Sequence, residues 1–538
     1  MSVLNNIFPQ PEGIPAEWRL NGFIEQREYL VNGELRTWQG QMNEVISPVS
    51  LNNSGLVEKN IIGSTPLLTE AESLEALDAA VNAYQNGTGE WPTMSVAKRI
   101  GHIELFLKEM KNQRAEIVKL LMWEIGKNLP DSEKEFDRTC IYIEDTIKGL
   151  KHIDHGNSTF ENEEGIIAQI RRVPLGVALC MGPYNYPLNE TFSTLIPALI
   201  MGNTVVFKPA KFGVLLLKPL LNVFKVCFPK GVINVIYGKG RETVGAIMET
   251  GKIDVFAFIG TNKGASEIKK QHPKPHRLRG VLGLDAKNPA IILPDADMDV
   301  TLAECVAGSL SYNGQRCTAL KIIFVHEDVA EDFTKKYVEA VSKLKCGMPW
   351  EKDVKITPLP EPGKSAYLTG LVDDAKKYGA VVINENGGEV NDTFFYPAVL
   401  YPVNAQMRVY SEEQFGPVVP IVPYKELDEV INYVVQSNFG QQISIFSNDP
   451  AKVGHLIDEF ANQVGRININ AQCQRGPDVY PFNGRKDSAE GTLSVSDALR
   501  AFSIRLLIST KDNAANKAIV GSIVREHQSN YLRMDYIF

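Results

Sequence analysis

The sequence predicts an α/β protein with more than one lobe. Its 538 residues exceed the roughly 250–300 residues at which single hydrophobic cores stop growing. Short β-rich runs alternate with helical stretches through the middle and later parts of the chain, which is typical of parallel sheets covered by helices. A hydrophobic fraction of 44% and a charged fraction of 22% provide enough apolar surface for packed cores.

The first elements in the chain are helical. From about Glu70 to Leu150 apolar residues recur at helical spacing, as in "AKRIGHIELFLKEMKNQRAEIVKLLMWEI", which predicts amphipathic helices. The next segment, "TFENEEGIIAQIRRVPLGVALCMGP", is strand-like with turn residues. Farther on, "FGVLLLKPLLNVFKVCF" is strongly apolar, but Lys218, Pro219 and Lys225 interrupt it. We interpret this run as a buried helix and not as a membrane span.

Two series of strands follow. The first extends to about Val300 and comprises "VALCMG", "TVVFKP", "VINVIYG", "VFAFIG" and "PAIILP". The second, which suggests another lobe, comprises "KIIFVHE", "AVVINE", "VVPIVPY", "QISIFSND" and "GRININ". In such sheets ligands bind at the carboxyl ends of the strands. "AFSIRLLISTK" is a further strand candidate, and the tail beyond it is polar and compatible with a helix.

The composition favours a cytoplasmic protein that binds small molecules. A net charge of −8 argues against a nucleic-acid or anionic-membrane surface. The amino terminus, "MSVLNNIFPQPEGIP", lacks the basic and apolar regions of a secretory signal. The cysteines are scattered and contain no C-x-x-C pair, which fits a reducing compartment and no zinc site; they are Cys140, Cys180, Cys227, Cys305, Cys317, Cys346 and Cys473.

His272 and His276, in "KKQHPKPHRLRG", have a spacing that suggests a metal site. The nearby prolines argue against a shared helical face, and no cysteine or carboxylate cluster flanks the pair. We therefore expect a solvated loop and no metal.

Three motifs carry candidate chemistry, each with an ordinary structural alternative. In "VFAFIGTNKGASEIKK" a strand ends at Gly260 and a helix opens near Gly264, which creates a phosphate-binding turn or a plain α/β crossover. "GNTVVFKPAK" delivers Lys208 at the end of a strand, where a lysine is either functional or solvated. Cys317, in "SYNGQRCTALK", is either a nucleophile or one more inert buried thiol.

The order of the motifs adds information. The chain resembles the aldehyde dehydrogenase superfamily from about Trp18 to Lys511, on "MGPYNYPLNE", "GNTVVFKPA", "FAFIGTNKG", "LDAKNPAIILPDADMD", "GQRCTALK", "EEQFGPVVPIV" and "RININ". Within it, "SYNGQRCT", "PYNYPLN" and "QRGPDVYPF" look like the non-phosphorylating glyceraldehyde-3-phosphate dehydrogenase branch. The resemblance implies a Rossmann-like coenzyme domain (1–153 and 173–284) and an α/β catalytic domain (285–492). It also implies a small β oligomerisation element (154–172 and 493–538) in a homodimer or homotetramer.

The resemblance also implies a mechanism. Cys317 would be the nucleophile, whose thiolate adds to an aldehyde carbonyl. The Asn185 amide and the backbone N–H of Cys317 would hold the resulting oxyanion. Hydride would then leave for a nicotinamide, and a thioester would remain on the enzyme.

For the coenzyme the resemblance implies NADP, with NAD also possible. It assigns Lys208 to the adenosine ribose, Gly260 and Thr261 to the pyrophosphate, and Glu413 to the nicotinamide ribose, with Phe415 in the same site. Relatives that prefer NAD usually carry a glutamate at the position of Lys211. Because a lysine attracts a 2′-phosphate that a carboxylate would repel, Lys211 predicts NADP. The alternative is a lysine that only faces solvent.

Three arginines indicate the substrate. Arg138, Arg316 and Arg475 match positions around the substrate in the phosphoaldehyde branch, with Tyr186 nearby. Guanidinium groups hold phosphate in a bidentate fork. We expect a small anionic aldehyde, glyceraldehyde 3-phosphate first and a semialdehyde second, although each arginine alone also suits a surface ion pair.

One family residue is absent. The general-base glutamate belongs to a segment usually read "E-L-G-G-K-N", which here is "GLDAKN", with Gly283 at the glutamate position. Without the carboxylate, water activation loses typically ~10²–10⁴-fold. Asp285 is two residues beyond Gly283. In a strand its side chain would point to the same face, but it would lie about 6–7 Å farther along. Coenzyme A or phosphate as the acyl acceptor would also fit this absence, as would a catalytically silent relative that acts as a binding or structural protein.

Overall fold

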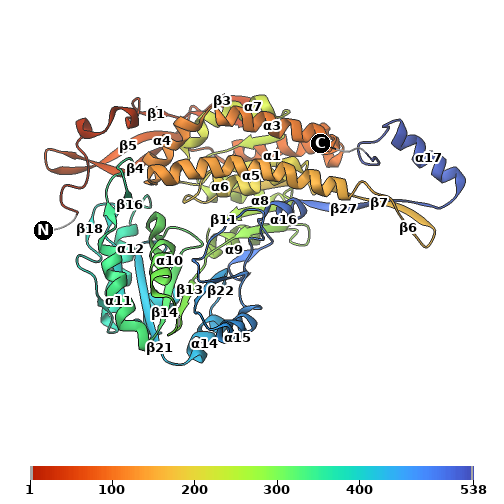
Figure 1. Ribbon diagram of the computed structural model, residues 1–538. Coiled ribbons are helices and arrows are strands. Elements are labelled where there is room, and N and C mark those ends of the chain that lie inside the picture. The colour runs from red at the N-terminus through yellow and green to blue at the C-terminus, as the bar shows by residue number, and fades with distance from the viewer. Residues whose placement is uncertain (1–3, 535–536, 538) are drawn as a thin grey trace.

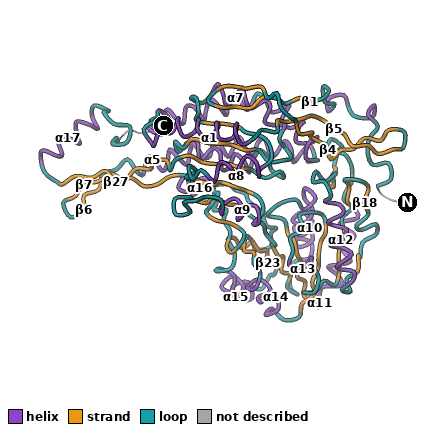
Figure 2. Tube along the Cα trace, turned by 180° about the vertical axis from the view of Figure 1, so that it is seen from behind, coloured by secondary structure: helices purple, strands orange, loops and turns teal. Residues whose placement is uncertain are grey.

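The computed structural model describes residues 4–534 and 537 and has two lobes, each built around its own sheet (Figure 1). A narrow arm projects from one lobe, and the amino terminus lies at the opposite end of the protein (Figures 1 and 2). The predicted α/β fold class is confirmed.

The first lobe contains an eight-stranded sheet in the order β26-β12-β11-β8-β9-β10-β2-β3. Its five central strands are parallel, and the strands added at its edges are antiparallel. Every residue of β9 is buried, as expected for a parallel strand covered on both faces. The strands are β2 (Glu28–Val31), β3 (Glu34–Thr37), β8 (Val177–Met181), β9 (Thr204–Lys208), β10 (Ile233–Val235), β11 (Val255–Ile259), β12 (Arg279–Gly283) and β26 (Ala489–Glu490).

Helices surround this sheet where the periodicity predicted them. α1 and α6 pack against β8 and β9. α7 lies within the apolar run that we interpret as a buried helix. The helices are α1 (Glu70–Tyr84), α2 (Glu90–Thr93), α3 (Val96–Lys111), α4 (Arg114–Ile125), α5 (Leu129–Gly156), α6 (Asn189–Ile200), α7 (Lys218–Cys227), α8 (Gly240–Glu249), α9 (Asn262–Lys270) and α16 (Val495–Ala501).

The second lobe contains a seven-stranded sheet in the order β17-β20-β21-β14-β13-β23-β24. Its strands are β13 (Asn288–Ile292), β14 (Leu320–His326), β17 (Val381–Val382), β20 (Ala398–Tyr401), β21 (Val418–Tyr424), β23 (Gln442–Phe446) and β24 (Arg466–Ile469). Its helices are α10 (Met298–Leu310), α11 (Glu327–Ser342), α12 (Lys364–Lys377), α13 (Arg408–Ser411), α14 (Leu427–Gln436) and α15 (Pro450–Phe460).

The chain crosses between the two sheets within "GLDAKN". Strand β12 ends at Gly283 in the first sheet, and β13 begins at Asn288 and pairs with β14 and β23 in the second. The sequence pattern predicts "PAIILP" as the last strand of the first series. That assignment is wrong, because the run forms the first strand of the second sheet. This crossover places the segment that lacks the family glutamate between the lobes.

The arm is a three-stranded sheet formed by β6 (Glu161–Glu163), β7 (Ile166–Pro174) and β27 (Ser503–Lys511). All nine residues of β27 pair antiparallel with β7, which confirms the strand predicted from "AFSIRLLISTK". The β element expected from residue 154 to residue 172 begins and ends later, because α5 continues to Gly156 and β7 continues to Pro174. Helix α17 (Ala514–Arg525) follows on the arm and has no buried residue (Figure 1).

Smaller sheets complete the fold. β1 (Ile24–Glu25), β4 (Met42–Asn53) and β5 (Leu56–Pro66) form a separate three-stranded sheet near the amino terminus. This sheet contacts the second lobe, since Ser50 Oγ donates to Asp392 at 2.5 Å and Thr393 Oγ donates to the Pro48 carbonyl at 2.6 Å. Three strand pairs remain: β15 (Lys345–Cys346) with β16 (Val354–Ile356), β18 (Val390–Asn391) with β19 (Phe394–Phe395), and β22 (Phe439–Gly440) with β25 (Arg485–Lys486).

The prediction for His272 is wrong. Its side chain is buried, and its ring nitrogens contact the Ile253 carbonyl at 3.0 Å and the Lys274 amide at 3.2 Å. His276 is exposed. The sequence pattern missed the burial because local prolines say nothing about tertiary packing.

Within residues 4–534 and 537, no helix is long and apolar enough to cross a membrane, and no three His, Cys, Asp or Glu side chains are placed to share a metal ion.

Candidate active site

Cys317 lies where two cavities between the lobes meet. One, of about 310 Å³, is called the substrate chamber below, and the other, of about 450 Å³, is called the coenzyme cleft; Cys317 lines both. The thiol follows α10 and a tight turn in which Tyr312 and Asn313 have positive φ angles of 49° and 55°. Cys317 is only half-buried, whereas five of the other six cysteines are fully buried.

The charges around Cys317 oppose one another. Burial raises the pKa of the thiol above its ordinary value, while the Lys321 ammonium lowers it and the Glu413 carboxylate raises it. Lys321 is buried, donates to the Cys317 carbonyl at 3.3 Å and forms an ion pair with Glu413. Because a thiolate is the nucleophilic form, Lys321 is a functional candidate that the sequence pattern did not single out, although it ends the quoted motif "CTALK".

Asn185 is held beside the chain that carries the thiol. Its Nδ2 donates to the Gln315 carbonyl at 2.8 Å, and its own carbonyl accepts from Lys127 Nζ at 2.7 Å. Lys127 forms a fully buried ion pair with Glu135. Glu135 in turn accepts from the backbone N–H groups of Leu188, at 3.0 Å, and Asn189, at 3.2 Å. This buried pair, which no sequence motif indicated, fixes the loop that delivers Asn185.

The substrate chamber brings together all four residues predicted for it, Arg138, Arg316, Arg475 and Tyr186. Two of the arginines are already ion-paired. Arg138 donates twice to Asp478, at 2.8 Å each, and Arg475 pairs with Glu190 and, at 3.2 Å, with Asp478.

The three arginines therefore differ in how available they are to an anionic ligand, and for Arg138 and Arg475 the ion-pair alternative holds within the chamber. Arg316 alone has no carboxylate partner among the described residues; its Nη2 donates to the carbonyls of Ala307, at 3.2 Å, and Gly308, at 2.8 Å, and to Gln472 Oε1, at 3.4 Å. Burial alone would raise the pKa of Asp478, but the hydrogen bonds from Arg138 and the charge of Arg475 hold it below its ordinary value. The signal for this carboxylate was present in "QRGPDVYPF", where Asp478 follows Arg475 by three residues.

The coenzyme cleft is lined by all six residues predicted for it: Lys208, Lys211, Gly260, Thr261, Glu413 and Phe415. Lys208 ends β9, and burial lowers its pKa to about 8. Among residues 4–534 and 537, its Nζ has one hydrogen-bond partner, the Pro209 carbonyl at 3.4 Å. Thr261 is the N-cap of α9, since its Oγ accepts from the Gly264 N–H at 3.1 Å. A Cβ at Gly260 would lie 2.4 Å from the Phe258 ring, so any larger residue there would force the ring to move.

Asp285 also lines this cleft, but not in the way that its sequence position suggested. Strand β12 ends two residues earlier, so a distance based on strand spacing does not apply. Its carboxylate accepts from the Asn262 N–H, at 2.8 Å, at the start of α9. Burial and the neighbouring Glu413 raise the pKa of Asp285 to about 6. Two carboxyl groups therefore share this part of the cleft.

Gly283 also lines the coenzyme cleft. Its φ lies outside the left-handed region, and an added Cβ would meet Ile259 and Leu493 at 3.5 Å, an ordinary contact distance. The backbone there accepts a Cβ, so backbone strain does not explain why the glutamate is missing.

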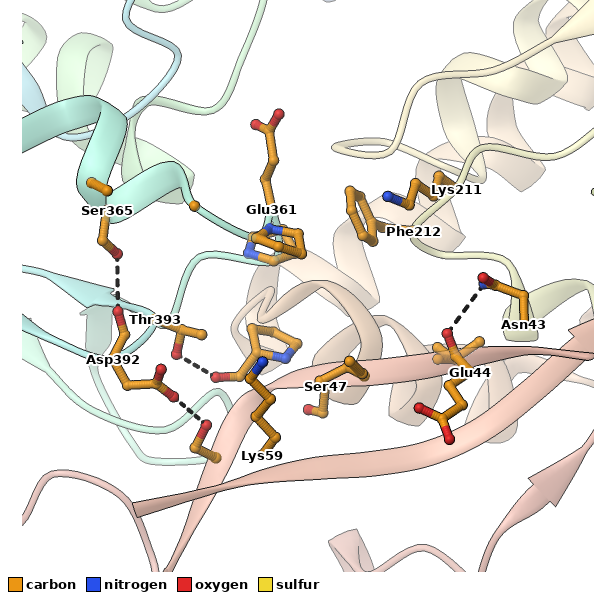
Figure 3. A pocket seen from close by; sticks show the side chains of 18 of the residues that line it. Asn43, Glu44, Ser47, Lys59, Lys211, Phe212, Glu361, Ser365, Asp392 and Thr393 are labelled. Atoms are coloured by element: carbon orange, nitrogen blue, oxygen red, sulfur yellow. Dashed lines mark hydrogen bonds between the residues drawn. The ribbon is translucent and has the colours of Figure 1, made fainter. Parts of the chain in front are cut away.

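A larger groove of about 1270 Å³ continues from the cleft and shares Lys211, Phe212 and Glu361 with it. Figure 3 shows these three residues around the groove, with strands of the amino-terminal sheet along its floor and the start of α12 at one side. Lys211 is exposed, and its Nζ lies 5.2 Å from the Phe212 ring centroid. Lys211 is thus placed at the junction of the cleft and the groove, where it is free to meet an anionic group.

Comparison with known proteins agrees with this architecture. Residues 48–505 match the aldehyde dehydrogenase family. The NADP-dependent glyceraldehyde-3-phosphate dehydrogenase of Pisum sativum is 32% identical over 437 residues, covering 80% of this chain and 86% of that protein. Malonate-semialdehyde dehydrogenase 1 of Bacillus licheniformis is 27% identical, covering 87% and 94%.

Among solved structures, NADP-dependent glyceraldehyde-3-phosphate dehydrogenase from Bacillus halodurans C-125, complexed with NADP, superimposes with a TM-score of 0.82. It is 31% identical, and the match covers 90% of this chain and 99% of that one. The family match covers Cys317, all the cleft residues described above and every strand of both sheets except β2 and β3. The chain belongs to the aldehyde dehydrogenase family.

Proposed function

We propose that this protein catalyses NADP-dependent oxidation of a small anionic aldehyde, with glyceraldehyde 3-phosphate as the first candidate and 3-phosphoglycerate as its product. The observation that carries the proposal is the position of Cys317, which lines both a cleft with lysines at its wall and a small chamber with arginines. A nucleophile at that junction would contact an aldehyde on one side and a nicotinamide on the other. The names of the glyceraldehyde-3-phosphate dehydrogenase relatives support the same activity.

The residues of the cleft fit NADP. Lys208 is a buried cation with one weak carbonyl contact, which suits a ribose hydroxyl or phosphate oxygen. Lys211 would attract the 2′-phosphate, the N-terminus of α9 would face the pyrophosphate, and Glu413 would accept from a ribose hydroxyl. When bound, NADP accepts the hydride that the oxidation releases.

The chain's own residues supply the remaining chemistry. The Cys317 thiolate adds to the aldehyde carbon, and Lys321 stabilises the ionised sulfur. Asn185 Nδ2 has a second N–H besides the one that it gives to Gln315. That N–H and the backbone N–H of Cys317 would hold the oxyanion until the adduct collapses to a thioester.

The chamber also supports a second candidate substrate. Because Asp478 and Glu190 offset Arg138 and Arg475, Arg316 is the cation that would bind the anionic group. One cation suits the single carboxylate of a short semialdehyde as well as a phosphate, and the malonate-semialdehyde relative favours that alternative.

The arm supports a homodimer or homotetramer. Ile504 and Leu507 on β27 are 50% and 60% exposed, and contact with another subunit would bury them. We place the domain boundaries at residues 284 and 492, with the arm as the oligomerisation element.

The proposal is tested by comparing Cys317→Ser with Cys346→Ser, since Cys346 is the other half-buried thiol and burial raises its pKa to about 12. We expect Cys317→Ser to lose NADPH production with glyceraldehyde 3-phosphate and malonate semialdehyde, and Cys346→Ser to retain it. Iodoacetamide should modify Cys317 and inactivate the enzyme. Full activity of Cys317→Ser, or a preference for long apolar aldehydes, would refute the proposal.

A further inference from the structure

Asn189 is a buried amide without a partner in the wall of the substrate chamber. It is the first residue of α6, is 1% exposed and lines the same cavity as Cys317. Neither its Nδ2 nor its Oδ1 has a hydrogen-bond partner among the described residues. A buried polar group in this state calls for a ligand or another explanation.

The neighbouring polar groups differ from Asn189, since most already have partners. Arg138 is bound by Asp478, Glu190 is bound by Arg475, and Ser311 Oγ donates to the Ala307 carbonyl at 2.6 Å. The backbone of Asn189 is fixed, because its N–H donates to Glu135 at 3.2 Å. Asn189 is therefore held at its backbone, and its side-chain amide has a donor and an acceptor that no described residue uses.

We propose that Asn189 binds a hydroxyl group of the substrate, which makes the substrate a hydroxyaldehyde. A hydroxyl both donates and accepts, so one hydroxyl can pair with Oδ1 and Nδ2 together. A phosphate or carboxylate oxygen only accepts and would leave Oδ1 unpaired. With the aldehyde carbon at Cys317 and the anionic group at Arg316, the hydroxyl belongs to the carbon between them. A chamber of about 310 Å³ suits such a three-carbon chain.

This inference rests on the proposed function and deepens it, because it separates a hydroxyaldehyde from an unsubstituted semialdehyde. Asn189 becomes a specificity residue, distinct from the groups that perform the chemistry. Sites built to bind a hydroxyl reject analogues that lack it, since the buried polar groups then stay unpaired.

The test uses two substrates that differ by one hydroxyl, glyceraldehyde 3-phosphate and 3-oxopropyl phosphate. In the wild-type enzyme we expect kcat/KM to favour the hydroxylated substrate by roughly 10- to 100-fold. Asn189→Leu, which keeps the branched arrangement of heavy atoms and has no polar atom, should lose that preference. It should do so by losing activity with glyceraldehyde 3-phosphate while retaining activity with the deoxy substrate.

Ser311→Ala is the matched control, because it removes a chamber hydroxyl whose bond is made within the protein; its preference should stay as in the wild type. The melting temperature of Asn189→Leu without ligands should not fall. A lower melting temperature with equal loss on both substrates would assign Asn189 a structural role and overturn the inference. If Asn189→Leu does not fold, the same ratio in Asn189→Ala decides.

The outcomes also separate the two proposals. A wild-type enzyme that oxidises both substrates equally would overturn the role of Asn189 and leave the proposed function intact. A wild-type enzyme that oxidises neither these nor malonate semialdehyde would overturn the proposed function itself.

Discussion

Lys211 is exposed at the junction of the coenzyme cleft and the large groove (Figure 3), so we expect it to decide between NADP and NAD. Lys211→Glu replaces attraction of the 2′-phosphate with repulsion, which should lower the NADP to NAD ratio of kcat/KM by about 10-fold or more. Lys239→Glu is the control, since Lys239 lines the groove but not the cleft. Equal ratios in wild type and Lys211→Glu would show that this lysine only faces solvent.

Asp285 should make coenzyme binding depend on pH. Its pKa is raised to about 6 by burial and by Glu413, so as pH rises through 6 it loses a proton and adds a second negative charge to the cleft. We expect the Kd for NAD to increase roughly 3- to 10-fold between pH 5 and pH 7 in the wild type, and to stay constant in Asp285→Asn.

NAD is the appropriate probe because the 2′-phosphate of NADP itself titrates near pH 6, by analogy with other phosphate monoesters. The Asp285 carboxyl also affects the stability of the fold. Its pKa is higher in the folded state than the ordinary 3.8, so the folded state binds more protons and stability falls as pH rises through about 4 to 6. A wild-type Kd for NAD that does not change with pH would show that Asp285 does not face the bound coenzyme.

Strand β12 ends at Gly283, the position of the family's general-base glutamate. In the proposed mechanism Cys317, Asn185 and Lys321 serve the oxidation step, but Gly283 offers no carboxylate to activate water, so deacylation should limit turnover. We expect a burst of NADPH near one per active subunit, followed by a slow steady rate.

Gly283→Glu should raise that steady rate, roughly 10-fold or more, because it supplies a general base at a backbone position where a Cβ makes only ordinary contacts. Gly283→Gln has the same shape without the charge and should not. The burst should be measured in plain buffer, then with coenzyme A or phosphate added. A fast steady rate without a burst would mean that another group activates water, and Asp285→Asn would then be the variant to examine.

The arm, formed by β6, β7 and β27, should hold subunits together. Its outer strand β27 is at the edge of the arm sheet and presents exposed apolar side chains, which favour pairing with another subunit. We expect Leu507→Glu to reduce the molecular mass measured by size-exclusion chromatography with light scattering. Leu56→Glu changes an equally exposed leucine, 64% exposed in β5, and should leave the mass unchanged. A monomeric wild type would exclude the arm as an oligomerisation element.

Much of the fold was predictable because strand and helix periodicities are local. The helices between residues 70 and 150, the buried helix α7 and strand β27 were identified from their own residues. The division between the sheets was less accessible, since "PAIILP" has the same apolar pattern whichever sheet it joins. The Ile253 carbonyl that His272 contacts lies 19 residues earlier in the chain, so the local pattern carries no signal that this histidine is buried.

The sequence by itself determined the α/β class, the candidate nucleophile Cys317, the absent glutamate at Gly283 and part of the lining of each cavity, because residue types in a recurring order carry that information. Only the folded chain decided the charge balance. Asp478 and Glu190 reach Arg138 and Arg475 from other segments, Lys321 reaches Glu413, and Asn189 is left without a partner among the residues that the structure describes. Electrostatic and hydrogen-bond energies depend on distance and burial, and these exist only once distant segments have packed together.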